Sequence, residues 1–204
     1  MNNHYTFKIK TWIWYNSLGW LLGMILLLGI AILGEALFAE KLRGGQSVIG
    51  IGLGTGMGFM QWRYLKKFYN WPITWLWYSM LGFSGMYLFY DLLSIQFELK
   101  PEKVLPVVTL LAGAMSGYLQ QHYILKGRMK KPKAWILINA FSWFAVHLLT
   151  GALFLLQLKE NEFLPRAIIL TLAFTFILIG GPLIGLFSSY YFTKIQNSTS
   201  VSEN

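Results

Sequence analysis

His147 is the titratable side chain that the sequence places deepest in an apolar stretch. An ionisable group within such a stretch is a functional candidate, because burying it in lipid is costly. The other interpretation is a neutral histidine, hydrogen-bonded and packed against Thr150. The chain contains no cysteine, which excludes disulfides and thiolate metal sites. Neither paired carboxylates nor a His-rich cluster accompany His147, so we predict no catalytic residues, no metal and no cofactor.

Ser116 is the one serine whose surroundings suggest a nucleophile. The segment Ala114-Met-Ser116-Gly117, followed by His147 in the next apolar stretch, resembles rhomboid intramembrane proteases. Those proteins carry a Gly-x-Ser-Gly serine in one span and a histidine in a later one. This chain departs from them at Ala114, which replaces the first glycine. The helical rise also separates Ser116 and His147 by about 10 Å in depth, and a working pair needs hydrogen-bond reach. Intramembrane proteolysis is therefore a distant alternative.

The glycine-rich stretch 50–58 is not a phosphate-binding loop. It lacks the Gly-x-Gly-x-x-Gly pattern and a following Lys-Ser/Thr, and no strand precedes it. Its glycines at Gly50, Gly54 and Gly58 are four apart, and Gln61 follows three residues later. This spacing places all four residues on one face of a helix, as in closely packed membrane helices.

The same face recurs twice further along the chain. We considered two roles for it. One is helix packing. The other is a narrow path lined by the three faces, with a polar ring where each face ends. The three copies are Gly54, Gly58 and Gln61; Gly113, Gly117 and Gln120; and Gly181, Gly185 and Ser188.

A second set of matching residues lies on the helices that precede the glycine faces. Asn16, Ser79 and Asn139 each follow a tryptophan by four residues in segments that align without gaps. An asparagine near the membrane interior usually bonds across helices. Interhelical contact is therefore the expected role of these residues, and solute contact is the alternative.

Composition indicates the elements that position these residues. Hydrophobic residues make up 55% of the 204 residues and charged residues only 12%, with a mean hydropathy of +0.49. Long apolar runs separated by short charged islands are typical of membrane-spanning helices. We therefore predict an all-α membrane protein, with the whole chain, residues 1–204, as a single domain. The expected spans are about 11–38, 46–67, 72–97, 104–126, 133–158 and 164–193.

The spans pair into three two-helix repeats, at about 11–67, 72–126 and 133–193. Since each repeat has two spans, all three enter the membrane from the same side, so an axis along the membrane normal should relate them. A bundle with a pseudo-threefold axis is the predicted result. We expect the polar residues 196–204 to be a disordered tail. Tryptophans near the span ends are predicted to anchor at the membrane interface, namely Trp12, Trp14, Trp71, Trp75, Trp77 and Trp135.

Basic residues predict the orientation. Eleven of the 17 Lys and Arg residues fall in the N-terminal segment, the second and fourth loops and the C-terminal segment. By the positive-inside rule these parts are cytoplasmic. We therefore predict a multi-pass protein of the cell (inner) membrane with both termini in the cytoplasm. The cluster 126–133 would attract anionic lipids, and a docking site for an acidic protein is the alternative. Because orientation accounts for the charge, no nucleic-acid partner is predicted.

The pattern Gly-x-x-x-Gly-x-x-Gln-Trp-x-x-Leu-Arg/Lys resembles a group of uncharacterised bacterial multipass membrane proteins that carry it two or three times. The second copy in this chain has Gln121 in place of the tryptophan, and the third has lost both the glutamine and the tryptophan. The resemblance covers most of the six spans and implies no activity. It rests on Gly54, Gly58, Gln61, Trp62, Leu65 and Lys66, and in the second copy on Gly113, Gly117 and Gln120.

Two functions follow as expectations. The first is a non-enzymatic integral membrane protein that serves assembly, as a homo-oligomer or as a subunit of a larger complex. The second is a small-solute permease or passive pore along the repeat axis. No acidic residue falls well inside a span, which counts against proton- or sodium-coupled transport.

Overall fold

The computed structural model describes residues 7–38, 45–126, 133–158, 175 and 178–193, and their regular elements are all helices. Within these ranges the side chains of 35–38, 102 and 151–158 are not described. The predicted all-α class is confirmed. The expected tail 196–204 lies outside the described residues, as do 164–174, 176 and 177 of the sixth expected span. The helices are α1 (Ile9–Phe38), α2 (Ser47–Tyr69), α3 (Thr74–Phe97), α4 (Pro101–Gln120), η2 (Gln121–Leu125) and α5 (Lys133–Leu158), followed by a helix over 178–193.

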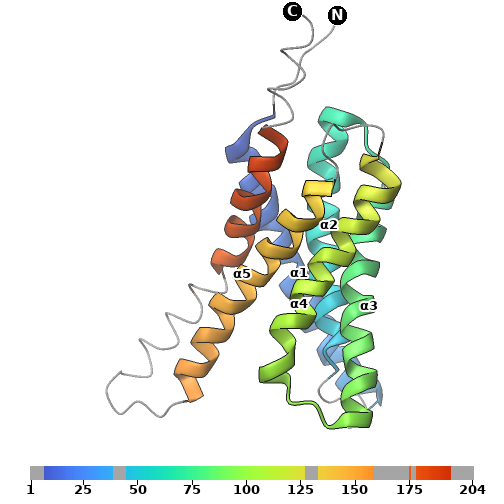
Figure 1. Cartoon of the computed structure of the whole chain (residues 1–204), viewed down its shortest axis with the longest axis vertical. Coiled ribbons are helices and arrows are strands. Elements are labelled where there is room, and N and C mark those ends of the chain that lie inside the picture. Colours follow the sequence, from blue (N-terminus) through green and yellow to red (C-terminus); the bar gives the residue numbers. More distant parts are fainter. Residues whose placement is uncertain (1–6, 39–44, 127–132, 159–174, 176–177, 194–204) are drawn as a thin grey trace, which may run out of the picture.

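The helices form a bundle in which consecutive helices pack on each other, α1 on α2, α2 on α3, α3 on α4 and α4 on α5 (Figure 1). The helix over 178–193 returns to the first one, because Gly181 and Gly185 approach the backbone of Ser17 and Ile13 on α1. The start of α1 and the end of this last helix lie at the same end of the bundle, at the top of Figure 1.

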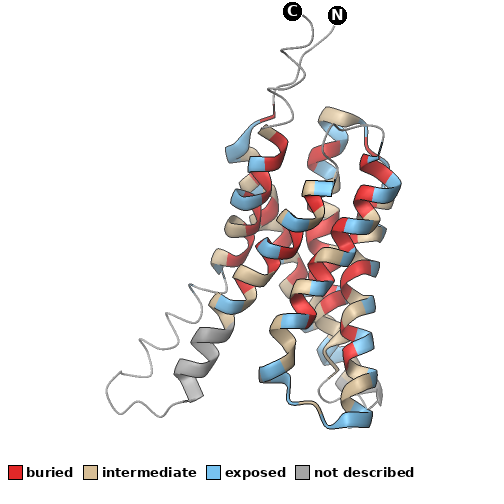
Figure 2. Cartoon of the chain, in the orientation of Figure 1, coloured by how far each residue is buried: buried red, intermediate tan, exposed pale blue. Residues whose placement is uncertain are grey.

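The outer surface of the bundle is more apolar than that of a typical water-soluble protein, and its core holds polar as well as apolar side chains. Its buried residues include many amides and hydroxyls, and its exposed residues include many large aliphatic and aromatic side chains. Buried residues follow the inward faces of the helices and gather towards the upper end (Figure 2). Among the exposed side chains are Ile25, Ile32, Leu92, Ile95 and Phe141.

Two of the described helices contain stretches long and apolar enough to cross a membrane. They are Ile9–Gly34, with a mean hydropathy of 2.2, and Lys133–Thr150, with 1.2. The six predicted spans are therefore not confirmed by this criterion, although two of the helices are consistent with a membrane protein. One physical reason that α2 falls short is its composition, because glycine and glutamine stand where aliphatic side chains would raise the hydropathy.

The tryptophans divide into two groups. Trp14 and Trp77 are 60% and 49% exposed, as an interfacial anchor requires. The prediction is wrong for the other four, Trp12, Trp71, Trp75 and Trp135, which are all buried inside the protein. For each of the three wholly buried ones, Trp12, Trp75 and Trp135, the indole N–H finds an acceptor on a neighbouring helix. A span-end tryptophan can therefore be a core residue.

Asp91 on α3 holds the start of α2. Its two carboxylate oxygens accept hydrogen bonds from the backbone N–H groups of Gln46 and Ser47, both at 2.8 Å. The first N–H groups of a helix have no partner within the helix, and a carboxylate also complements the positive end of its dipole. Asp91 therefore works as a tertiary cap that fixes α2 against α3.

Candidate functional site

Gln61 on α2 links two other helices through its side-chain amide. Its carbonyl oxygen accepts the indole N–H of Trp75 on α3 at 3.2 Å. Its Nε2 donates to Oδ1 of Asn16 on α1 at 2.9 Å. All three side chains are buried.

Gln120 on α4 makes the same pair of bonds one repeat further along. Its carbonyl oxygen accepts the indole N–H of Trp135 on α5 at 2.6 Å. Its Nε2 donates to Oγ of Ser79 on α3 at 2.7 Å. Ser79 occupies the position that Asn16 holds in the first repeat.

Ser188 takes the third place with a shorter side chain. Its hydroxyl accepts the indole N–H of Trp12 on α1 at 2.8 Å and donates to the carbonyl of Ile184 in its own helix at 2.6 Å. Asn139, the third counterpart of Asn16, donates instead to the carbonyl of Gly113 at 3.0 Å. Apart from His147, the residues predicted as a polar path or as interhelical contacts thus bond to one another, to tryptophan indoles, to Ser79 or to backbone. We call Gln61, Gln120 and Ser188, with the three tryptophans that donate to them, the Trp–Gln ring.

The predicted packing glycines make the closest helix contacts beside this ring. A Cβ built on Gly58 would lie 3.2 Å from the Cα of Leu76, and one on Gly117 would lie 3.0 Å from that of Ile136. In the helix 178–193, the same atom on Gly185 would lie 2.8 Å from the Cα of Ile13. The three contacted residues are equivalent, since each directly follows the tryptophan of its segment.

The glycine four residues earlier on each face makes an equally close contact. A Cβ on Gly54, Gly113 or Gly181 would meet, at 2.7 to 3.0 Å, the Cα of the residue that follows Ser79, Asn139 or Asn16. Real Cβ atoms almost never lie closer than 3.0 Å to a neighbouring heavy atom, so each of these distances is at or below that limit. No larger residue fits without separating the helices.

Aromatic side chains pack against the ring. The indoles of Trp75 and Trp135 lie 5.6 Å apart, and Phe192 packs on Trp12, Trp71 and Trp135. Tyr69, beyond the expected span 46–67, joins this cluster at its edge, and burial raises the pKa of its hydroxyl.

The hydrogen bonds of the Trp–Gln ring are complete within the part of the chain that the structure describes. There, no buried side-chain nitrogen or oxygen lacks a hydrogen-bond partner. Trp12, Trp75, Trp135 and Phe192 are wholly buried around it. Each amide oxygen, amide nitrogen and hydroxyl of the ring thus has a hydrogen-bond partner within the protein, and packed aromatic side chains lie around it.

His147 bonds to a partner that the sequence did not indicate. Its Nδ1 lies 3.1 Å from Oγ1 of Thr109 on α4, and Thr109 lies 2.7 Å from the hydroxyl of Tyr87 on α3. The hydroxyl of Thr150 bonds to the backbone carbonyls of Val146 and His147, so the two residues lie together as expected, while the imidazole bonds to Thr109. Ser116 is seven residues beyond Thr109, about 10 Å along α4, and packs against Gly82.

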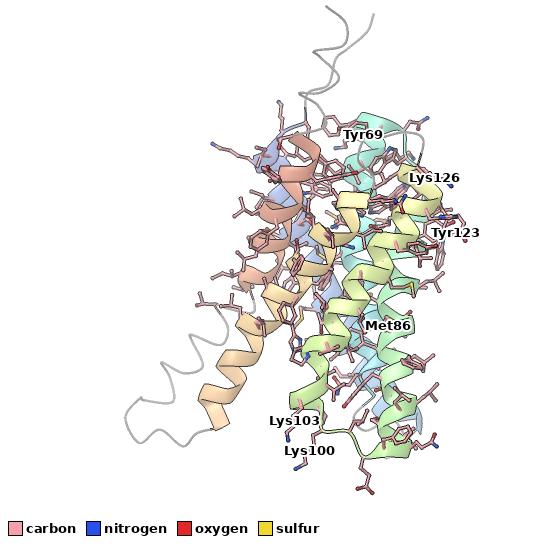
Figure 3. All side chains as sticks on the ribbon, viewed as in Figure 1. Tyr69, Met86, Lys100, Lys103, Tyr123 and Lys126 are labelled. Atoms are coloured by element: carbon pink, nitrogen blue, oxygen red, sulfur yellow. The ribbon has the colours of Figure 1, made fainter. Side chains whose placement is uncertain are left out.

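A cavity of about 270 Å³ opens beside His147. Along α3, its wall residue Tyr87 is eight residues, about 12 Å, from Ser79 at the Trp–Gln ring, with the buried Phe83 between them. The cavity thus lies on the side of the ring towards Lys100 and Lys103, the lower end in Figure 3. It is lined by Trp20, Met24, Leu27, Ile49, Leu53, Tyr87, Leu105, Thr109, Trp143, Val146, His147 and Thr150.

A larger apolar groove of about 800 Å³ runs between α5 and the helix 178–193. In the first two repeats the paired helices meet closely at this level, where Gly19 touches Met57 and Gly82 touches Ser116. The third repeat has Ser142 at the position of Gly19 and Gly82, and Ser142 lines the groove. Its walls include Leu137, Phe141, Ala145, Leu148, Leu186, Phe187 and Tyr190.

Sequence reasoning missed several residues around these cavities. Tyr87, Thr109, Trp20 and Trp143 carry no motif, and their helices give no sign of which polar groups meet. The available signal was weak: Tyr87 and Thr109 are polar residues inside expected spans, so each needed a partner. Among the described residues, no three His, Asp or Glu side chains come together in a cluster that could hold a metal ion.

Comparisons with protein-family models, with curated proteins and with solved structures found no match.

Proposed function

We propose that this chain is a six-span protein of the cell membrane that has no catalytic role and serves the assembly of a membrane complex. The single observation that carries the proposal is the apolar outer surface of the bundle around a core that contains hydrogen-bonded polar groups. Buried amides and hydroxyls bond to one another while large apolar side chains face outwards. In water this arrangement would expose a large aggregation-prone surface, whereas in lipid it is the stable one.

The recurring contacts support three parallel two-helix repeats around a pseudo-threefold axis. Each glycine face packs on the first helix of the following repeat, and the last face packs on α1. The tryptophan of each repeat donates to the Gln or Ser of the preceding one. A relation that returns to its start after three steps is the expected signature of such an axis.

The bonds of the Trp–Gln ring favour packing over permeation. Gln61 and Gln120 use both the oxygen and the nitrogen of their amides in bonds between helices. Opening a path would break these bonds and separate packed indoles. The ring is therefore a joint between repeats, and the apolar groove beside α5 is the surface left for assembly.

We assign this groove to an apolar helix of a second copy or of another membrane subunit. In the first repeat, glycines on both helices allow close backbone contact at this level, and in the second Gly82 does so from one side. The third repeat leaves a gap flanked by exposed side chains, among them Phe141 and Leu186. A partner helix would bury this surface by close packing, which is the main force for association in lipid.

Purification from native membranes, followed by mass analysis, tests the assembly role. We expect a stoichiometric partner or a defined homo-oligomer, and an Ala145→Trp variant that fills the groove should lose it. The matched control is Gly85→Trp, because Gly85 is the equivalent residue on α3 and a Cβ there meets nothing within 4 Å. A lone monomer, or equal loss with both variants, would contradict the proposal.

A permease or passive pore is the second candidate, and one observation favours it. The 270 Å³ cavity lies within the bundle on one side of the Trp–Gln ring, where half of a closed path would be. Solute flux into vesicles that is changed by Gln61→Leu and Gln120→Leu, with the fold retained, would support this candidate.

A further inference from the structure

The cavity beside His147 has the size of a small organic ligand. An apolar cavity of about 150 Å³ is enough to hold one benzene molecule. This cavity, at about 270 Å³, has room for one ring with substituents. It belongs to the bundle itself, since five helices contribute to its wall.

The cavity wall favours an aromatic guest. Trp20 and Trp143 both line it, with their ring centroids 5.8 Å apart and tilted by 41°. Tyr87 and Met24 add a third ring and a thioether. Tilted rings and sulfur both make favourable contacts with the edges and faces of an aromatic molecule.

One edge of the cavity is polar and carries no fixed charge. The chain of hydrogen bonds from Tyr87 through Thr109 ends at Nδ1 of His147. The other ring nitrogen, Nε2, has no hydrogen-bond partner among the described residues, although His147 lines the cavity. No acidic or basic residue other than His147 appears among the described lining residues, so a charged ligand would find no counter-ion.

The hydroxyl of Thr109 can bond to either neutral tautomer of His147, so Nε2 can be a donor or an acceptor for a ligand. When Thr109 donates to Nδ1, the proton of a neutral imidazole is on Nε2, which can then donate. When Nδ1 carries the proton and donates to Thr109, Nε2 becomes an acceptor. A ligand hydroxyl could therefore serve as either donor or acceptor at this nitrogen.

We infer that this cavity binds a small uncharged phenolic compound, with its ring against the contacting indoles of Trp20 and Trp143 and its hydroxyl on Nε2 of His147. A phenol matches the three features together: one ring, one hydroxyl, and no charge at pH 7, since a phenolic hydroxyl titrates near pH 10. This site is independent of the assembly role and of the groove beside α5.

The test uses 4-fluorophenol as the probe and fluorobenzene as its partner without the hydroxyl. Both are titrated against the full-length protein in detergent, and binding is followed by fluorine NMR with empty micelles as the blank. We expect saturable binding of 4-fluorophenol at one site, tighter than that of fluorobenzene. His147→Phe should weaken it by about tenfold while leaving fluorobenzene unchanged.

His122→Phe is the matched control, because His122 is exposed near the opposite end of the bundle. It should bind 4-fluorophenol as the unaltered protein does. Thr109→Val, which removes only the hydroxyl, is the second test variant and should also weaken the probe. Binding that does not saturate, or that is equal for the two probes, would overturn the inference. So would a folded His147→Phe, or in its place a folded Thr109→Val, that retains full affinity.

Discussion

At the scale of single residues, each buried amide of the Trp–Gln ring joins side chains of two other helices. Gln120 satisfies the indole of Trp135 and the hydroxyl of Ser79 at once. A buried donor that loses its acceptor costs about 1–3 kcal/mol, since no water replaces the bond. The ring is thus the place where a single polar substitution should be most costly.

We therefore expect Gln120→Leu to lower the free energy of unfolding by about 1–3 kcal/mol. Thermal or denaturant unfolding in detergent, followed by circular dichroism, would measure the change. In a double-mutant cycle with Trp135→Phe, the coupling energy between Gln120 and Trp135 should be about 1 kcal/mol. Gln96→Leu is the control, because Gln96 is exposed on α3. An equal effect of the two Gln→Leu changes would disprove the role given to Gln120.

Asp91 is a second residue with a contribution that can be measured. Asp91→Ala should destabilise the protein by about 1 kcal/mol, because two backbone N–H groups at the start of α2 would lose their acceptor. Asp91→Asn should cost less, since one amide oxygen remains to accept. Unfolding measurements on the two variants should show this order, and the reverse order would rule out the capping role.

At the scale of elements, glycine sets how closely the helices approach. A Cβ on Gly56 would lie 2.2 Å from the backbone nitrogen of Gly23 and 2.5 Å from the carbonyl oxygen of Gly19. These are backbone atoms, so only a shift of α1 against α2 could relieve the overlap. Gly56 therefore brings α2 close to α1, while Gly54 and Gly58 on another face of α2 bring it close to α3.

We expect Gly56→Ala to destabilise the protein by more than about 2 kcal/mol, whereas Gly85→Ala should be neutral or stabilising by up to about 1 kcal/mol. The latter follows from helix propensity alone, because a Cβ on Gly85 meets nothing within 4 Å. Melting temperatures in the same detergent would compare the two. A neutral or stabilising Gly56→Ala would mean that helix propensity, and not close packing, controls this position.

The element η2 changes which residues are buried. In α2 the buried pair after Gln61 is Tyr64 and Leu65, but in the second repeat it is Ile124 and Leu125. A π-helix bonds each N–H to the carbonyl five residues back, as Lys126 does with Gln121 at 2.8 Å. The additional residue shifts the register by one, so Tyr123 faces outwards (Figure 3).

At the scale of the whole molecule, the orientation predicted from the basic residues can be tested at the two ends of the bundle. Lys126 and Lys103 mark opposite ends (Figure 3). The chain has no cysteine of its own, so single introduced cysteines can be read without background. The end with Lys126 should face the cytoplasm.

A membrane-impermeant maleimide should therefore label Lys103→Cys in intact cells and Lys126→Cys only in inverted vesicles. Both sites should be labelled once detergent dissolves the membrane, which serves as the control. Labelling of both cysteines from one side would refute the spanning arrangement. The opposite sidedness would refute only the predicted orientation.

Much of the architecture followed from the sequence alone. The long apolar runs predicted helices, and the glycine spacing predicted the packing faces, because helical geometry depends only on residues three and four apart. The equivalence of Gln61, Gln120 and Ser188 was also visible without coordinates. These are local regularities of the sequence, and they can be recognised without knowing which residues are in contact in the folded chain.

Tertiary structure alone decided the partners. Residues far apart in the sequence form the bond between Trp12 and Ser188 and the contact between Thr109 and His147, and no local pattern encodes their distance. The tryptophans at the span ends were predicted at the membrane surface, since an indole fits an interface and a hydrogen-bonded core equally well. Which one applies depends on whether another helix brings an acceptor within about 3 Å, and that is a property of the assembled bundle.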